Sequence, residues 1–223
     1  MDTTQRRLQA LFFDFDGVIV DSIQTKTEAF HILFNDCSDE VIQNVEEFHK
    51  QHGGISRVDK IAHAHEHFIG APLCEEELKK WSARYSDLVV EKVIEVPWIK
   101  GAKEFLESTR NSTLDVFVIS GTPEVELNYI IDKRGITDYF DERLGSPIRK
   151  PDHIRRLLEK YKLKPDDCVF IGDALTDYDA AKETGLHFVG IQGEVAFPAG
   201  TLVLEDCRSL QQAINNIFTP VSN

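Results

Sequence analysis

The feature that most constrains the fold is an alternation of strand-like and helical segments from Trp98 onward. The runs at 116–119 and 169–171 are apolar at every position, and segments with helical periodicity follow them. Strands without polar alternation are typical of parallel sheets covered by helices on both faces. The sequence therefore predicts an α/β fold with a Rossmann-like parallel sheet. In addition to the apolar run at 11–13, we expect strands at 115–119, near 143–144, at 168–171, 187–191 and 202–204. Helices are expected at 101–109, 124–134, 152–161, 176–184 and 209–217.

Residues 21–97 differ from this pattern because their periodicity is helical throughout. Turn-forming residues at Asp39, Gly53–Gly54 and Gly70 divide the span, and helices are expected at 25–34, 41–49, 58–68 and 75–93. We therefore expect an α/β core domain of residues 1–20 and 98–223, into which an all-helical cap domain of residues 21–97 is inserted.

Two carboxylates stand at the end of the first apolar run, in the sequence FFDFDG. Side chains of an extended chain repeat every two residues, so Asp14 and Asp16 leave the same face, and Gly17 allows a turn directly after them. Two acids in one small volume repel each other unless a cation or a proton resolves the repulsion. The pair indicates a metal site or an acid and nucleophile pair, with a structural turn as the alternative.

Polar residues also follow the other predicted strands. Ser120 begins a Ser-Gly-Thr segment after the run at 116–119, Lys150 follows the short strand, and Asp173 with Asp177 follows the run at 169–171. Each of these residues alone is typical of a helix cap, a turn or a solvated lysine. Because sites in open parallel sheets lie beyond the carboxyl ends of the strands, we expect the four groups to converge on one edge.

These four groups, in this order and with a helical insertion after the first, resemble the haloacid dehalogenase superfamily of phosphohydrolases. The resemblance rests on DFDGV at 14–18, VISGT at 118–122, Lys150-Pro151 and GDALTD at 172–177, and it covers almost the whole chain. The subgroup it indicates is that of β-phosphoglucomutase and phosphoglycolate phosphatase, whose members carry a small helical cap.

The resemblance implies a mechanism with a covalent intermediate. Asp14 is the candidate nucleophile, which would form an aspartyl-phosphate, and Asp16 is the candidate general acid and base. The catalytic set further includes Ser120 and Lys150, whose hydroxyl and ammonium groups suit a phosphoryl group with charged equatorial oxygens.

The same resemblance implies phosphate and metal ligands. Gly121 and Thr122 are expected to bind phosphate together with Ser120. Mg²⁺ is the expected cofactor, because carboxylates and phosphate oxygens are its preferred ligands. Its expected ligands come from Asp14, the backbone carbonyl of Asp16, Asp173 and, through water, Asp177.

Two residues of the cap are candidates for substrate binding. Arg57 follows a Gly pair in a segment that resembles the specificity loop of the β-phosphoglucomutases, and it could contact a second anionic group. The alternative is an ion pair with a nearby acid at the start of a helix. Lys26 stands where the mutases have a histidine, which makes mutase activity less probable. It is expected to contact either the substrate or a cap carboxylate.

Other cap signals are interpreted structurally. The three histidines at 63–67 lack the His-Glu-x-x-His order of a zinc site, and we expect a solvated helix face there. Trp81, Tyr85 and Leu88 form a helical stripe that predicts cap core.

The composition excludes some partners. The net charge of −13 argues against nucleic acids and acidic membrane surfaces as partners. The four cysteines form no Cys-x-x-Cys pair and are expected to be free thiols, and no signal peptide or long apolar run is seen. We therefore expect a soluble, cytoplasmic monomer or weak homodimer that acts on a small phosphorylated metabolite.

Three functions are compared. The leading prediction is a Mg²⁺-dependent phosphatase for a sugar phosphate or a phosphoglycolate-like acid. A phosphosugar mutase is the enzymatic alternative, and a dehalogenase is disfavoured because Asp16 suits phosphoester cleavage. A phospho-aspartate signalling module is the alternative from another class, but such domains are shorter and lack a cap.

Overall fold

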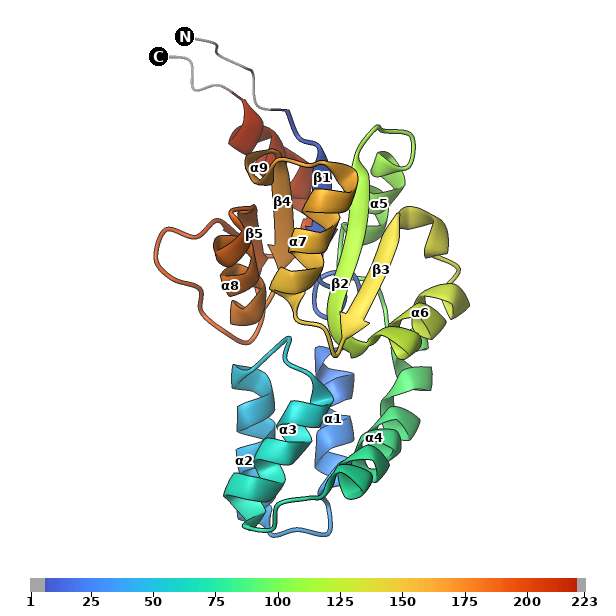
Figure 1. Ribbon diagram of the computed structural model, residues 1–223, viewed down its shortest axis with the longest axis vertical. Coiled ribbons are helices and arrows are strands. Elements are labelled where there is room, and N and C mark those ends of the chain that lie inside the picture. Colours follow the sequence, from blue (N-terminus) through green and yellow to red (C-terminus); the bar gives the residue numbers. More distant parts are fainter. Residues whose placement is uncertain (1–6, 220–223) are drawn as a thin grey trace.

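The computed structural model describes residues 7–219, in which one parallel sheet forms the core (Figure 1). Its six strands are ordered β3-β2-β1-β4-β5-β6, and every neighbouring pair is parallel. The strands are β1 (Ala10–Phe13), β2 (Asp115–Pro123), β3 (Glu142–Ser146), β4 (Cys168–Gly172), β5 (His187–Ile191) and β6 (Val203–Leu204). The predicted α/β fold with a parallel sheet is confirmed.

The central strands are apolar at every position because both faces of the sheet are covered. Phe12 lies beside Phe117 and Phe170 in register, and its ring centroid is 5.0 Å from that of Phe117. The next residue, Phe13, points to the other face and packs against Phe105. Each face thus has its own apolar core, which is the pattern expected of a parallel sheet between helices.

Helices cover the two faces. One face contacts α7 and α8, and the other contacts α5, α6 and α9. These helices are α5 (Ala102–Thr109), α6 (Glu124–Lys133), α7 (Lys150–Tyr161), α8 (Leu175–Thr184) and α9 (Leu210–Phe218). Short 3-10 turns η2 (Thr137–Tyr139), η3 (Pro165–Asp167) and η4 (Cys207–Ser209) complete the connections.

A group of helices lies beyond the carboxyl edge of the sheet, at the bottom of Figure 1. It consists of α1 (Ile23–Leu33), α2 (Asp39–Gln51), α3 (Arg57–His63), the π-helix η1 (Ala64–Ile69) and α4 (Glu75–Glu95). In place of the single helix expected at 58–68, the structure has α3 followed by η1. We call residues 21–97 the cap and the rest the core, and these bounds stay a prediction.

The cap has an aromatic interior. Phe30 packs against Tyr85, and Phe34 packs against Trp81, with ring centroids 4.4 and 5.0 Å apart. His65 is buried between Phe34 and Trp81. The expectation of a solvated histidine face at 63–67 is therefore wrong for His65, because η1 turns this ring into the cap interior.

Two adjacent chain segments join the cap to the core. The amide of Asp21 donates to the carbonyl of Pro97 over 2.9 Å, and the amide of Ile99 donates to the carbonyl of Ile19 over 3.0 Å. Because the chain leaves the core and returns to it at the same place, the helical group can form beside the sheet without interrupting the sheet. No helix in residues 7–219 combines the length and apolar character needed to cross a membrane.

Candidate active site

The strand register brings the predicted motifs to one place. Phe13, the last residue of β1, pairs with Val118 of β2 and with Ile171 of β4, so the carboxyl ends of these strands are neighbours. The amide of Asp14 donates to the carbonyl of Ile171 over 2.9 Å. Residues that follow the three strands therefore line the same edge, below which the cap lies.

Lys150 is the cation at the centre of the carboxylates. Its Nζ lies 2.8 Å from Oδ1 of Asp14 and 2.5 Å from Oδ1 of Asp177, and all three side chains are buried. Burial alone would lower the pKa of Lys150, but the two carboxylates outweigh it and raise that pKa. Lys150 is thus held protonated beside the candidate nucleophile.

The acids at this edge exceed the cations. Asp14, Asp173 and Asp177 each have a carboxylate oxygen within 4.8 Å of the others. Burial, together with Asp177 and Asp16, raises the pKa of Asp14 to about 7 although Lys150 opposes this, and burial followed by Asp14 raises the pKa of Asp173. A second cation is needed for all three acids to be ionised together.

The donor set fits a hard divalent cation. Buried carboxylates in a group of this size are suitable Mg²⁺ ligands, and Oδ1 of Asp14 accepts no hydrogen bond of regular geometry within residues 7–219. Glycine also allows a close approach here: Gly17 has φ +78°, and a Cβ on it would lie 2.2 Å from Oδ2 of Asp173. The side chain of Asp16 lies outside this carboxylate group, so only its backbone is left as a candidate ligand.

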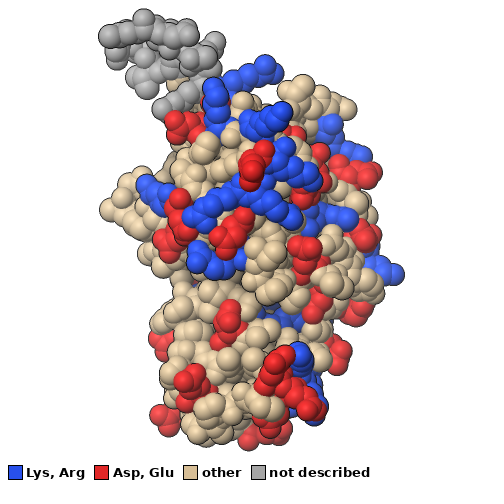
Figure 2. All heavy atoms as spheres, viewed as in Figure 1, with Lys and Arg blue, Asp and Glu red and all other residues tan. Residues whose placement is uncertain are grey.

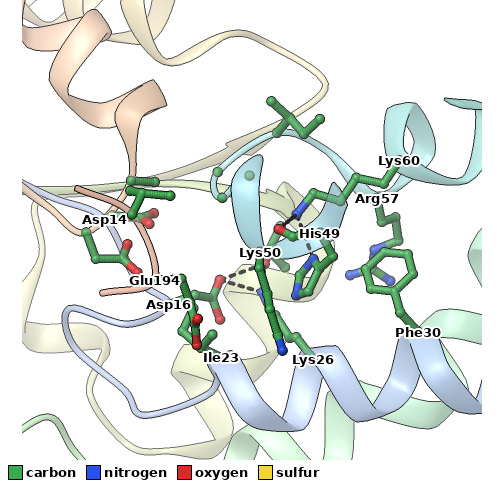
Figure 3. Close-up of a pocket in the computed structure, with 18 of the residues that line it drawn as sticks. Asp14, Asp16, Ile23, Lys26, Phe30, His49, Lys50, Arg57, Lys60 and Glu194 are labelled. Carbon is green, nitrogen blue, oxygen red and sulfur yellow. Dashed lines mark hydrogen bonds and ion pairs between the residues drawn. The ribbon is translucent and has the colours of Figure 1, made fainter. Parts of the chain in front are cut away.

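Asp16 has a separate set of partners (Figure 3). Its carboxylate accepts hydrogen bonds from Ser22 at 2.6 Å, Thr122 at 3.1 Å and Ser120 at 3.3 Å, and Nζ of Lys26 lies 2.5 Å away. Burial would raise the pKa of Asp16, but Lys26 and the hydrogen bonds lower it below its ordinary value. The candidate acid and base is therefore held ionised.

Lys26 joins the cap to the core. It comes from α1 of the cap, pairs with Asp16 of the core and donates to Oγ1 of Thr122 over 2.9 Å. Neither sequence-based alternative described this contact, because the carboxylate that Lys26 meets belongs to the core and not to the cap.

The loop at 120–122 combines a buried hydroxyl with close backbone packing. Oγ of Ser120 accepts from the amide of Thr122 over 3.0 Å. A Cβ on Gly121 would lie 2.5 Å from the carbonyl oxygen of Gly54, so glycine allows the cap loop to approach. The strand β2 continues irregularly through this loop to Pro123, beyond its predicted end at Ile119.

The loop before α3 rests directly on the core. Oγ1 of Thr176 donates to the carbonyl of Gly53 over 2.9 Å. Gly54 has φ +81°, and a Cβ there would lie 2.0 Å from Oγ1 of Thr176. The cap therefore covers the edge of the sheet in this structure.

Arg57 reaches this region but pairs with an acid. Its two terminal nitrogens donate to both carboxylate oxygens of Glu126, over 3.1 and 2.5 Å, and Nη1 also donates to Ser86 over 2.6 Å. The predicted alternative of an acidic partner is thus found, although Arg57 is buried rather than on the surface. Glu126 lies on α6 of the core, so the pair joins cap and core.

A cavity of about 70 Å³ lies between these groups. Its lining includes Asp14, Asp16 and Asp173 from the core and Lys26 and Lys60 from the cap. A wider groove of about 460 Å³ lies on the other side of the Gly54 loop, lined in part by Ser120 and Lys150. The smaller cavity holds the carboxylates and is the candidate active site.

The sequence reasoning missed several residues in and around this cavity. Ser22 and Glu126 have no motif of their own, and Thr176 lies within GDALTD without an expected role; residues of these types are common at helix starts and on helix surfaces. Lys60 and His49 were also missed. Their separation of eleven residues across two helices gives no local signal, and only the packing of α2 against α3 brings them together.

The chain belongs to the haloacid dehalogenase-like hydrolase family, whose model matches residues 11–191. The match spans all four motifs, from Asp14 to Asp177, and confirms the family indicated by them. The chain is accordingly a hydrolase by family.

Curated relatives narrow the subgroup. A phosphoglycolate phosphatase of Photobacterium profundum is 28% identical over 96 residues, which are 41% of this chain and 42% of that protein. A phosphoglycolate phosphatase of Vibrio parahaemolyticus is 24% identical over 202 residues, 84% of this chain and 85% of that protein. The first match spans less than half of its relative, whereas the second spans most of both chains.

Solved structures share the whole architecture. β-Phosphoglucomutase from Clostridium difficile superposes with a TM-score of 0.79 at 21% identity, covering 95% of this chain and 97% of its own. A mutant of CbbY from Rhodobacter sphaeroides in complex with xylulose-(1,5)bisphosphate gives 0.75 at 19% identity, with coverage of 91% and 96%. At these identities the likeness shows a common fold.

Proposed function

We propose that this protein is a Mg²⁺-dependent phosphatase that hydrolyses a small phosphorylated metabolite through an aspartyl-phosphate. The observation that carries the proposal is the arrangement of Asp14 beside Lys150, with Asp16 held separately by Lys26 and Thr122. Asp14 thus lies beside a cation that can bind the phosphoryl group, whereas Asp16 lies beside groups that can control its protonation.

In the first step a carboxylate oxygen of Asp14 attacks phosphorus, and the bond from phosphorus to the leaving oxygen breaks. Asp16 gives a proton to that oxygen. Because Lys26 keeps Asp16 ionised in the structure, Asp16 must first gain a proton, and displacement of Lys26 from its carboxylate on substrate binding would raise its pKa. In the second step Asp16 takes a proton from the water that attacks phosphorus, and the bond from phosphorus to the Asp14 oxygen breaks, which releases phosphate and restores the carboxylate.

Phosphate binding is assigned to the cations and hydroxyls around Asp14. Lys150 and Ser120, with the backbone amides at Gly121 and Thr122, would contact the equatorial oxygens as their charge grows. Asp177 positions Lys150 through its 2.5 Å contact. The water-mediated metal contact expected of Asp177 stays a prediction, because Asp177 also belongs to the group of carboxylates.

Asp14, Asp173 and the backbone carbonyl of Asp16 would hold Mg²⁺. When bound, the ion supplies positive charge that offsets repulsion between the carboxylates and the phosphate. The fit rests on the excess of buried acids over cations described above.

A phosphoglycolate-like acid or a sugar phosphate is the proposed substrate class, and the phosphoglycolate phosphatases among the relatives support it. A phosphosugar mutase is the second candidate, favoured by the fold shared with β-phosphoglucomutase. The contact of Lys26 with Asp16 disfavours it, because the mutases have a histidine at this position. We propose that the protein acts in the cytoplasm as a monomer or weak homodimer.

The test is hydrolysis of p-nitrophenyl phosphate and a set of phosphorylated metabolites with Mg²⁺. Asp14→Asn should abolish turnover while the folded state is retained, and the exposed Asp36 provides the matched control Asp36→Asn. Asp173→Ala should raise the Mg²⁺ concentration needed for half-maximal activity. Near-normal hydrolysis by folded Asp14→Asn, or full activity in excess chelator, would contradict the proposal.

A further inference from the structure

The cavity has two electrostatically different ends (Figure 3). The carboxylates Asp14 and Asp16 lie at the core end, whereas Lys60, His49 and Arg57 lie at the cap end. The core end is accounted for by the phosphoryl group and Mg²⁺. The cap end therefore needs a separate explanation.

Most cationic side chains that line the cavity have a counterion or are exposed. Lys26 pairs with Asp16, and Arg57 pairs with Glu126 through two hydrogen bonds. Lys50 is exposed to solvent. These charges need no ligand.

Lys60 differs from the other cavity cations. Its side chain is 5% exposed, and its Nζ donates to Nδ1 of His49 over 2.7 Å and to the His49 carbonyl over 3.3 Å. No carboxylate forms an ion pair with it within residues 7–219. The third neighbour is the ring of Phe30, whose centroid is 6.0 Å away. Lys60 is thus a buried cation whose direct contacts are neutral groups.

His49 is suited to a neutral role in this pair. Burial followed by Lys60 lowers the pKa of His49 to about 2, so its ring is uncharged. A protonated amine has only donors, which makes Nδ1 the acceptor and leaves the ring proton on Nε2. The pair therefore combines an ammonium group with an imidazole N–H donor.

A buried cation without a counterion is costly, and an apolar side chain of similar size would avoid that cost. An anionic ligand group would supply the missing charge. We infer that Lys60 and His49 form the subsite for a second anionic group of the substrate, either a carboxylate or a second phosphate, while the phosphoryl group to be cleaved faces Asp14. The inference rests on the proposed function. It assigns recognition of the second anionic group to Lys60 and His49 in place of Arg57, whose charge is already matched by Glu126.

The test compares substrates that differ in the second anionic group. 2-Phosphoglycolate and 2-hydroxyethyl phosphate have similar size, but only the first has a carboxylate. Xylulose 1,5-bisphosphate and xylulose 5-phosphate form the corresponding pair for a second phosphate. For each pair, kcat/KM of the compound with the second anionic group is divided by kcat/KM of the compound without it. The pair with the larger ratio identifies which anion the subsite binds.

Lys60→Met should lower kcat/KM for the preferred substrate with a second anionic group by about 10–100-fold, the range for one charge-assisted contact. It should change kcat/KM for the matched compound that lacks the second anionic group by less than about twofold. Lys60→Gln is the second variant, and Lys79→Met is the control for loss of a cap charge, because Lys79 is exposed and pairs with Glu75 on α4. Equal changes on both members of each pair would overturn the inference.

Binding without turnover separates this inference from the proposed function. Calorimetry would compare phosphonoacetate, which has a phosphonate and a carboxylate, with ethylphosphonate, which lacks the carboxylate. Tighter binding of phosphonoacetate that is lost in Lys60→Met supports the subsite even if no phosphoester is hydrolysed. Xylulose 1,5-bisphosphate would be measured with Asp14→Asn in both proteins, so that it is not hydrolysed. If neither phosphonoacetate nor xylulose 1,5-bisphosphate binds better to the protein with Lys60 than to Lys60→Met, the subsite is refuted.

Discussion

Replacing Lys60 by methionine should make the protein more stable at neutral and acidic pH. Burial lowers the pKa of Lys60 from 10.5 to about 7, with Lys26 acting in the same direction and Asp16 and Asp173 opposing it. At about 1.4 kcal/mol for each pKa unit, keeping this amine protonated in the folded state costs on the order of 5 kcal/mol. Methionine has a similar length and no charge, so the substitution removes this cost.

The gain is reduced by the partner that methionine leaves behind. Nδ1 of His49 loses its hydrogen bond, and an unpaired buried acceptor costs about 1–3 kcal/mol. The expected net increase in the free energy of unfolding at pH 6 is therefore about 2–4 kcal/mol. For a chain of this length, this corresponds to a rise in Tm of roughly 4–16 °C.

The pH dependence has a definite sign. The folded-state pKa of Lys60 lies below its unfolded value, so the unfolded chain binds more protons between pH 7 and 10.5. The destabilisation is fully present below about pH 7 and is lost as the pH rises toward 10.5. The advantage of Lys60→Met should thus shrink from pH 6 to pH 9.5.

Urea unfolding of the wild-type protein, Lys60→Met and the control Lys79→Met at pH 6, 8 and 9.5 would measure this. Lys79 is exposed, so its substitution should change stability by less than about 0.5 kcal/mol. A Lys60→Met protein that is no more stable than the wild type at pH 6, or whose difference does not depend on pH, would refute the reasoning.

Two further predictions concern catalysis. Lys26→Met should raise the pKa of Asp16, because Lys26 helps to hold that pKa below its ordinary value. The limbs of the pH profile of kcat/KM that depend on Asp16 should therefore move to higher pH. An unmoved profile with p-nitrophenyl phosphate would contradict the assignment of Asp16 as the general acid and base. Gly54→Ala should lower kcat/KM by about tenfold or more, because the new Cβ would lie 2.0 Å from Oγ1 of Thr176 and disturb the contact between the cap loop and the core. Gly70→Ala is its control, since Gly70 also has a positive φ but has nothing within 4 Å of the new Cβ, and equal losses in the two variants would exclude a role for the contact with Thr176.

The core could be predicted because its signals are local. Strands such as β2 and β4 are apolar at every position, and the residues that follow them reach one edge in any parallel sheet. The positions of Asp14, Lys150 and Asp173 therefore followed from strand ends and from the family motifs. Their convergence depends little on how the cap is placed.

The cap contacts could not be predicted in the same way. Arg57 and Glu126 are 69 residues apart and lie on helices of different parts of the chain, so their pairing depends on how the cap sits on the core. The contact between Lys26 and Asp16 depends on the same placement. Helical periodicity identifies which face of a helix is buried, but it does not specify which side chain that face meets.

The charges of the cavity connect stability with recognition. Without a substrate, the core end has more acids than cations, and the cap end has a buried ammonium without a counterion. In the proposed function a Mg²⁺ ion would offset the first imbalance, and a second anionic group on the substrate would offset the second. Because such a ligand binds the folded state alone, it should stabilise the protein by about 2.7 kcal/mol at a concentration of 100 times its Kd. The substrate with two anionic ends should therefore hold the cap against the core, since one end would pair with Lys60 of the cap and the other would contact Lys150 of the core.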